Sequence, residues 1–170
     1  YDLALRKPEP LVPRERRFEV SARLSASGEE RVPVKPAEVR DLDLSGAEAV
    51  AVCLLHAYAD GGHERAVREA LPEGVDVSLS SEVAPEIREH PRTTTAMANA
   101  YVLPIARRYL ERMRDALADE GLTAPLYIAL SHEGITSPED AARFPIRILE
   151  SGPAAGATEA ARSMPGEDRL

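Results

Sequence analysis

Two short apolar segments in the middle of the chain flank a segment with helical periodicity. The run Ala47–Leu55 is largely apolar and ends at His56, which predicts a strand buried on both faces, as in a parallel sheet. Residues 63–71 are predicted to form a helix, and Val75–Leu79 alternates as a second strand. Crossovers of this strand–helix–strand kind are nearly always right-handed and parallel. The sequence therefore predicts a parallel pair of strands joined by a helix.

The longest predicted element is a helix over residues 94–120. Its larger apolar side chains recur every four residues and predict one stripe facing the core, although such a stripe also permits a partner interface. The stripe consists of Met97, Tyr101, Ile105, Tyr109, Met113 and Leu117. Pro104 lies inside the helix, removes one backbone hydrogen bond and predicts a kink. Thr93–Thr95 is predicted to cap the helix start, and these hydroxyls and Asn99 could also face a ligand.

The N-terminal part has weaker signals. Residues 1–16 contain three prolines and no period, which predicts an extended arm. Segments 17–20 and 31–34 flank the small polar stretch Ser25–Gly28 and predict a β-hairpin. Residues 39–44 are predicted to form a short helix or turn.

The C-terminal part alternates between strand-like and helix-like segments. Leu126–Leu130 predicts a third buried strand, and Ile146–Leu149 predicts a further short strand. Ser137 has the sequence context of a helix cap, because proline and two acidic residues follow it. A helix rich in small residues is predicted from Ser151 to about Ser163. This alternation predicts an α/β fold.

Composition narrows the class of protein. The 170 residues carry 29 acidic and 21 basic side chains, a formal net charge of −8. Acidic proteins repel phosphate backbones, so nucleic acid is excluded as the main partner. No apolar run approaches the roughly 20 residues that a membrane helix needs, so no membrane partner is predicted. The single cysteine, Cys53, cannot form an internal disulfide, which favours a cytoplasmic location.

Few residue patterns carry recognisable chemistry. No histidine lies at helical i,i+4 spacing from another histidine or from the cysteine, so no metal site is predicted. Serine hydrolase chemistry is not supported, because no serine lies in a Gly-x-Ser-x-Gly motif. Cys53 lies within a predicted strand, where it would pack as a small apolar side chain rather than act as a nucleophile.

The segment Glu150–Gly156 is the most distinctive feature. Its helix start holds only small residues, so free amides and the positive end of the helix dipole are open to an anion. Glu150 precedes that helix and could orient a water molecule. The residues alone favour another use, in which Gly156 and the following alanines let the helix pack closely against a neighbour. No Walker or dinucleotide glycine pattern is present.

Several phrases occur in the order found in one family. They are Tyr1–Leu3 with Lys7–Arg14, Ala49–His56, Val77–Val83 with Pro85–Glu86, Arg92–Thr95, Asn99–Val102 with Pro104, and Glu150–Gly156. The chain thereby resembles the A-type subunit of the ATP-dependent hydantoinase/5-oxoprolinase family, which includes relatives that carboxylate acetone and acetophenone. The phrases cover nearly the whole chain. Family members commonly have Asn-Gly-Gly or Asp-Gly-Gly where this chain has Ser131–Gly134, a region that the resemblance places beside the substrate or nucleotide cleft.

The resemblance implies a fragment of an actin-like (ribonuclease H-like) ATPase fold with an N-terminal extended arm and hairpin. Residues 1–45 would form the arm and hairpin, 46–90 the strand–helix–strand end of the N-terminal region, and 91–170 the long helix and the start of the hydantoinase A domain. The first ATP phosphate loop would precede Tyr1 and the second would follow Leu170. The chain itself contains no Gly-Gly-Thr sequence.

The implied activity is ATP-driven opening of a cyclic amide, with Mg²⁺ and a B-type subunit or domain taking part. Glu150 would be catalytic, and Ser151, Gly152 and Gly156 would lie near the phosphates of ATP. The fragment alone is expected to be inactive and to bind no cofactor. Two alternatives are an ATP-dependent ketone carboxylase subunit and a non-catalytic actin-like scaffold.

Overall fold

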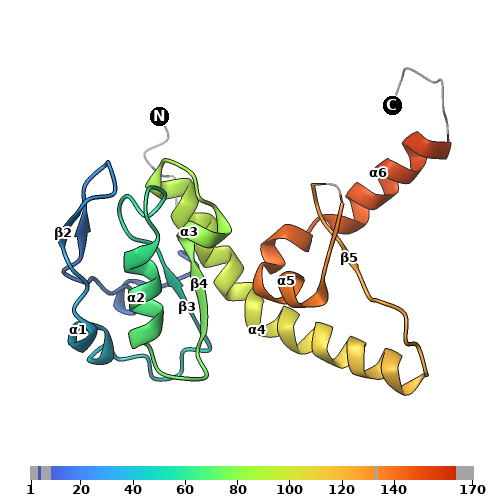
Figure 1. The fold of residues 1–170 in the computed structure, drawn as a ribbon, viewed down its shortest axis with the longest axis horizontal. Coiled ribbons are helices and arrows are strands. Elements are labelled where there is room, and N and C mark those ends of the chain that lie inside the picture. The colour runs from blue at the N-terminus through green and yellow to red at the C-terminus, as the bar shows by residue number, and fades with distance from the viewer. Residues whose placement is uncertain (1–3, 5–8, 133, 164–170) are drawn as a thin grey trace.

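The computed structural model describes residue 4 and residues 9–132 and 134–163, which form two bodies connected by one long helix (Figure 1). At one end of helix α4 (Glu89–Asp119) lie α1 (Pro36–Arg40), α2 (Gly62–Ala70) and the strands β3 (Ala49–Val52) and β4 (Asp76–Leu79). At its other end lie the C-terminal elements. No helix of the described residues is long and apolar enough to cross a membrane.

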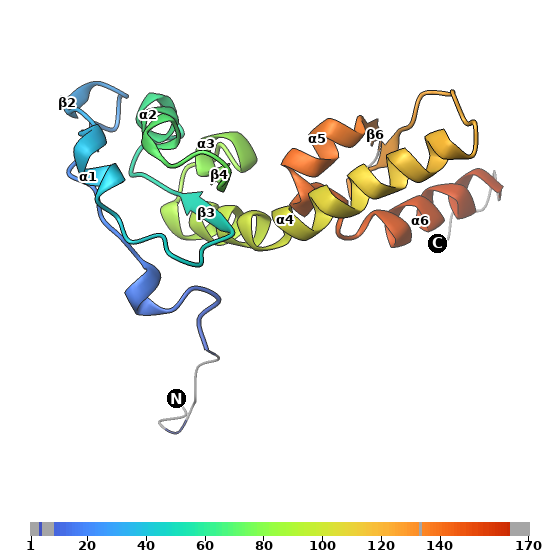
Figure 2. The ribbon, with the colours of Figure 1, turned by 90° about the horizontal axis from the view of Figure 1, so that it is seen from below.

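The first body is built on the strand–helix–strand unit that the sequence predicts. Strands β3 and β4 pair in parallel, with Ala49 opposite Asp76 and Val52 opposite Leu79, and α2 connects them. Figure 2 shows the two strands between α2 and α4. The core lies here and contains Val39, Val52, Val67, Ala70, Leu71 and Leu79. Helix α3 (Ser80–Val83) follows β4 without a break.

The predicted hairpin forms, but its first strand lies further along the chain. Strand β1 is Arg23–Leu24 and pairs antiparallel with β2 (Glu30–Val32), so the prediction of a strand over residues 17–20 is wrong. Burial explains the difference, because the Leu24 side chain is 3% exposed whereas that of Phe18 is 42% exposed. Residues 1–3 and 5–8 of the predicted arm lie outside the described residues, and η1 (Arg14–Arg16) is a short 3₁₀ helix within it.

The long helix begins at Glu89 and continues through the buried Pro104. The prediction that the four-residue stripe faces the core is wrong. Tyr101, Ile105 and Tyr109 are 65%, 61% and 58% exposed. The buried face of α4 instead consists of Arg92, Ala96, Asn99, Ala100, Leu103, Pro104 and Leu110. Small side chains on that face let the β3–β4 pair approach the helix closely, which larger ones would prevent.

The second body has less strand than the sequence predicts. Strand β5 (Ile128–Ala129) pairs antiparallel with β6 (Ile135–Thr136) rather than joining the parallel pair, so the predicted third buried strand is wrong. A 3₁₀ helix, η2 (Pro145–Ile148), stands where a short strand was predicted over residues 146–149. Two helices are as predicted: α5 (Pro138–Arg143), with the Ser137 hydroxyl accepting from the Asp140 N–H, and α6 (Ser151–Ser163).

Candidate functional site

The carboxyl end of the parallel pair carries a buried polar network centred on Glu64. The Glu64 side chain is 0% exposed. Its Oε1 accepts from the Leu54 N–H at 2.9 Å and from the Ser80 hydroxyl at 2.6 Å, and its Oε2 accepts from the Ser81 N–H at 2.8 Å. The carboxylate therefore ties the chain after β3 to the chain after β4. Buried carboxylates require partners of this kind because an unpaired charge is costly to bury.

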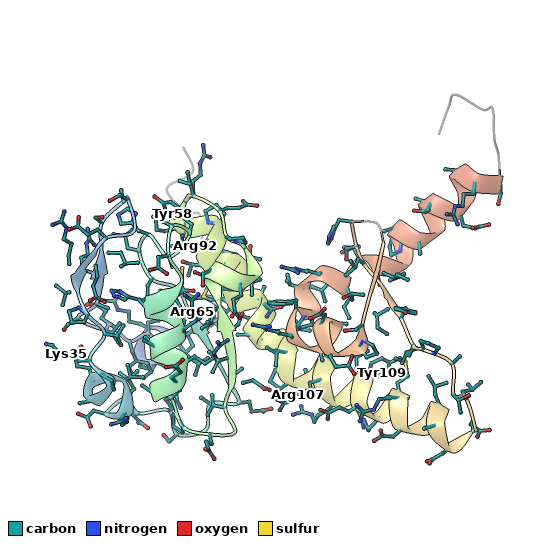
Figure 3. The ribbon with its side chains drawn as sticks, in the orientation of Figure 1. Lys35, Tyr58, Arg65, Arg92, Arg107 and Tyr109 are labelled. Atoms are coloured by element: carbon teal, nitrogen blue, oxygen red, sulfur yellow. The ribbon has the colours of Figure 1, made fainter. Side chains whose placement is uncertain are left out.

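Arg92 lies at the same edge and is almost as deeply buried, at 1% exposed. Its Nη2 donates to the Leu54 carbonyl at 2.6 Å, and its guanidinium lies 5.6 Å from the centre of the Tyr58 ring. Both side chains are labelled at this end of the molecule in Figure 3. The Arg92 Nε has no hydrogen-bond partner within the described part of the chain. This guanidinium holds backbone and ring in place instead of neutralising a carboxylate.

Two non-glycine residues near this edge have left-handed backbone. His56 has φ 62° and Arg88 has φ 91°, a conformation that is uncommon for residues with a side chain. They lie in the turns that follow β3 and precede α4, respectively. Cys53 is partly buried, and its Sγ lies 2.8 Å from the Thr93 hydroxyl oxygen, so it packs inside rather than facing an open site.

Thr93–Thr95 does not cap α4, contrary to the prediction. The helix has already begun at Glu89, so these residues lie in its second turn. Thr94 and Thr95 donate their hydroxyls to the carbonyls of His90 and Pro91. The hydroxyls of Thr94 and Thr95 therefore bond to their own helix, whereas that of Thr93 contacts Cys53.

Asn99 connects the two bodies and does not face an open space. It is 0% exposed. Its Nδ2 donates to the Ser78 hydroxyl at 3.1 Å and to the Arg143 carbonyl at 3.2 Å, and its Oδ1 accepts from the Ile146 N–H at 3.2 Å. A single side chain of α4 thus holds the end of β4 against α5 and η2.

Glu82 makes a second connection between the bodies. Its carboxylate pairs with Arg68 at 3.1 Å and with Arg143 at 2.7 Å, and its carbonyl accepts from Arg147 Nη2 at 3.2 Å. The Phe144 ring contacts two of these arginines, with the Arg143 and Arg147 guanidinium carbons 5.0 and 4.4 Å from its centre. These contacts fix the position of α5 and η2 relative to the parallel pair.

A hollow lies between α5, η2 and the β5–β6 loop. The hollow has a volume of about 130 Å³ and is lined by Leu130, His132, Thr136, Asp140, Ala141, Phe144 and Arg147. It adjoins the start of α6, because the Ser131 N–H donates to the Arg147 carbonyl and the Ser131 hydroxyl accepts from the Glu150 N–H at 2.9 Å. The hollow and the helix start therefore share one loop.

The predicted site residues all lie at this helix start. The Glu150 side chain is exposed and has no hydrogen-bond partner among the described residues. Ser151 is half-buried, whereas a side chain added at Gly152 or Gly156 would meet nothing within 4 Å. No residue of α6 is buried, so its small residues do not serve close packing within the described part of the molecule.

Sequence reasoning missed Glu64, Arg92, Glu82, Asp140 and Arg147. The sequence signal for Glu64 was available, since a carboxylate on the apolar side of an amphipathic helix must find buried donors. Asp140 and Arg147 come to line one hollow through the packing of α5 against η2. Within the ranges that the structure describes, no group of three or more His, Cys, Asp or Glu side chains could hold a metal ion.

Family comparisons relate this arrangement to known proteins. A model of the hydantoinase/oxoprolinase N-terminal region matches residues 1–75, and the hydantoinase/oxoprolinase model matches residues 92–170. The chain belongs to the hydantoinase/oxoprolinase family. It is 33% identical over 163 residues to caprolactamase subunit alpha of Pseudomonas jessenii, which covers 91% of this chain and 23% of that subunit. It is 35% identical over 135 residues to 5-oxoprolinase of Saccharomyces cerevisiae, covering 74% and 10% of the two chains.

Solved structures of family members have the same arrangement of elements. The ATP-dependent caprolactamase of Pseudomonas jessenii superposes with a TM-score of 0.82 at 29% identity, covering 95% of this chain and 24% of that chain. Nucleotide-free acetone carboxylase superposes with a TM-score of 0.80 at 27% identity, covering 93% and 24%. This hydantoinase/oxoprolinase chain therefore spans about a quarter of the length of those two proteins and has a part of their fold.

Proposed function

We propose that this chain is part of the ATP-dependent subunit of a cyclic amide hydrolase, which activates a ring amide carbonyl so that water opens the ring. The observation that carries the proposal is the match to caprolactamase subunit alpha along 91% of the chain. The match to 5-oxoprolinase supports the same substrate class, because caprolactam and 5-oxoproline each contain an amide within a ring. The acetone carboxylase beta subunit matches at lower sequence identity, 28%.

The proposal includes an actin-like arrangement of the whole subunit, with the two ATP phosphate loops in other parts of it. The absence of a Gly-Gly-Thr sequence from these 170 residues supports this placement. It also includes the division into an arm and hairpin over residues 1–45, a strand–helix–strand unit over 46–90 and the start of the hydantoinase A domain over 91–170.

The start of α6 could bind a phosphate group through its backbone amides, but the described residues do not form a site for a whole nucleotide. The first amides of α6, at Ser151 and Gly152, have no partner within their own helix, and nothing crowds Gly152 or Gly156. The described residues contain no cluster that would hold Mg²⁺. When bound, ATP would supply the phosphoryl group that makes the amide carbonyl reactive.

In this proposal Glu150 orients or deprotonates the attacking water. Its backbone N–H is fixed by the Ser131 hydroxyl at 2.9 Å, which sets the position of the residue at the start of α6, and its carboxylate is exposed to solvent. The proposed partner is a B-type subunit or domain, in line with the naming of the caprolactamase relative as a subunit. A cytoplasmic location is proposed because the one cysteine, Cys53, cannot form a disulfide within these 170 residues.

The test uses the full-length subunit together with its partner subunit. Phosphate release from ATP is measured with caprolactam, with 5-oxoproline, or with acetone and bicarbonate. A lactam is expected to stimulate phosphate release and to be opened. Stimulation by acetone alone would indicate a ketone carboxylase instead, and no stimulation by any substrate would support a scaffold.

A pair of variants in this assay tests the role of Glu150. Replacing a general base typically costs about 10²–10⁴ in rate, so Glu150→Gln is expected to lower lactam-stimulated turnover by at least about 100-fold. Glu159→Gln is the matched control, because Glu159 lies on the same helix and, among the described residues, its carboxylate accepts only from the Ser163 hydroxyl. Equal turnover of the two variants would remove Glu150 from the mechanism.

A further inference from the structure

The hollow between the β5–β6 loop, α5 and η2 is lined by both apolar and polar side chains. Leu130, Ala141 and Phe144 contribute the apolar lining, and His132, Thr136, Asp140 and Arg147 contribute the polar groups. Its volume of about 130 Å³ is well below the roughly 300–1,000 Å³ of sites for drug-sized ligands, so a nucleotide is excluded and a single small ring remains.

Arg147 is held in place before any ligand arrives. One of its Nη atoms donates to the Glu82 carbonyl at 3.2 Å, and its guanidinium carbon lies 4.4 Å from the centre of the Phe144 ring. A guanidinium has five N–H donors, so most of them are still available. Glu82 is itself fixed by Arg68 and Arg143, which makes the position of Arg147 part of the connection between the two bodies.

Asp140 supplies an acceptor on the same hollow. Its backbone N–H is fixed by the Ser137 hydroxyl at 3.1 Å, in the first turn of α5. Its exposed carboxylate makes no hydrogen bond or ion pair with any described residue, Arg147 included. A charged donor and a charged acceptor thus line one hollow without neutralising each other.

We propose that this hollow binds the ring of a small cyclic amide. An amide needs a donor for its carbonyl and an acceptor for its N–H, and Arg147 and Asp140 supply the two. The apolar side chains would contact the ring methylenes. A simple anion would be repelled by Asp140 and a simple cation by Arg147, whereas a neutral amide uses both. The choice of an amide among neutral ligands rests on the proposed function.

The experiment measures binding of ε-caprolactam and 2-pyrrolidinone to the full-length subunit with its partner, by calorimetry in the absence of ATP. Asp140→Asn is expected to weaken lactam binding at least ten-fold with an unchanged melting temperature. Glu139→Gln is the matched control, because Glu139 is the preceding residue of α5 and lines a different hollow, against α4. It is expected to bind the lactams within two-fold of the unchanged protein.

Three results would overturn the proposal. They are no binding of either lactam, lactam binding by Asp140→Asn within two-fold of the unchanged protein, and tighter acetate binding by that variant with lactam binding unaffected. The last result would identify an anion site.

The proposed function is judged separately by lactam-stimulated phosphate release. If lactam stimulates release with a KM that Asp140→Asn leaves unchanged, the function stands and the hollow is not the lactam site. If lactam binding depends on Asp140 but lactam does not stimulate phosphate release, the hollow is a lactam site and the proposed function is wrong.

Discussion

Glu64 and Arg92 hold the two backbone polar groups of a single residue, Leu54. The Glu64 carboxylate accepts from the Leu54 N–H at 2.9 Å, and the Arg92 guanidinium donates to the Leu54 carbonyl at 2.6 Å. Both side chains are buried, at 0% and 1% exposed. Strand β3 ends at Val52, just before this residue, and two side chains take over the hydrogen bonds that a longer strand would have made.

Glu64→Ala is expected to destabilise the protein strongly. The change removes the acceptor from two backbone N–H groups and the Ser80 hydroxyl, and each buried donor left unpaired costs about 1–3 kcal/mol. We expect a loss of at least about 3 kcal/mol in the free energy of unfolding, measured by urea denaturation. Glu69→Ala, at an exposed position on the same helix, should change it by less than about 0.5 kcal/mol. Similar losses for the two variants would contradict the role given to Glu64.

Asn99→Leu is expected to loosen the second body without removing α4. The variant leaves the Ile146 N–H and the Arg143 carbonyl without their partner, at a cost of about 1–3 kcal/mol for each buried group. Hydrogen exchange at the Ile146 amide should accelerate at least ten-fold. Thr94→Ala is the control, since the Thr94 hydroxyl bonds only to its own helix. An unchanged exchange rate at Ile146 in Asn99→Leu would show that other contacts dock η2.

The Glu82–Arg143 ion pair should contribute modestly and in a salt-dependent way. The Arg143 side chain is 52% exposed and that of Glu82 is 21% exposed, so solvent screens part of the interaction. A double-mutant cycle with Glu82→Gln and Arg143→Gln should give a coupling energy of about 0.5–1 kcal/mol that falls in high salt. The more exposed Arg108–Glu48 pair, at 3.4 Å, should give a smaller value. Equal coupling energies would mean that the Glu82–Arg143 ion pair stabilises the fold no more than an exposed surface pair does.

Two positions on α4 distinguish its buried face from the predicted one. Leu103 is 5% exposed, whereas Ile105 is 61% exposed. Leu103→Ala should lower the free energy of unfolding by about 2–5 kcal/mol, because it leaves a cavity on the buried face of α4. Ile105→Ala should lower it by less than about 0.5 kcal/mol. The reverse order, measured by thermal or urea unfolding, would restore the stripe as the core face.

Asp76 should make stability fall as the pH rises above the ordinary aspartate range. Burial raises the pKa of Asp76 above its usual value of 3.8, although the Arg107 guanidinium beside it acts in the opposite direction (Figure 3). The folded state therefore holds this proton more tightly than the unfolded chain does. Its contribution to stability is present below pH 3.8 and is lost as the pH rises through the folded pKa.

Asp76→Asn should remove this part of the pH dependence of unfolding. Unfolding is measured between pH 3 and pH 7 for the unchanged protein and the variant. Asp115→Asn, at an exposed residue of α4, is the control and should leave the slope unchanged. Identical slopes for the unchanged protein and Asp76→Asn would show that Asp76 does not titrate above its ordinary range.

Predictions from local chemistry were correct where neighbours in sequence decide the outcome. The Ser137 cap and the bounds of α6 depend on residues within one or two helical turns. The parallel β3–β4 pair was also predictable, because apolar runs on both sides of a helix leave few other arrangements. The prediction of Leu126–Leu130 as a buried strand was wrong, because only the partly buried β5 forms there, and the short strand predicted over Ile146–Leu149 is a 3₁₀ helix. A short apolar run does not reveal which element will cover it.

By itself, the sequence determined the family of this protein, its strand–helix–strand unit and the small-residue start of α6. Only the tertiary structure decided which face of α4 is buried, and it selected Arg92 and Asn99 over Tyr101 and Ile105. It also brought Asp140 and Arg147 to one hollow through the contacts of Glu82 and Asn99. The physical reason is that a polar side chain can be buried when backbone groups distant in sequence satisfy its hydrogen bonds. The periodicity of a helix does not indicate which distant groups will lie beside it.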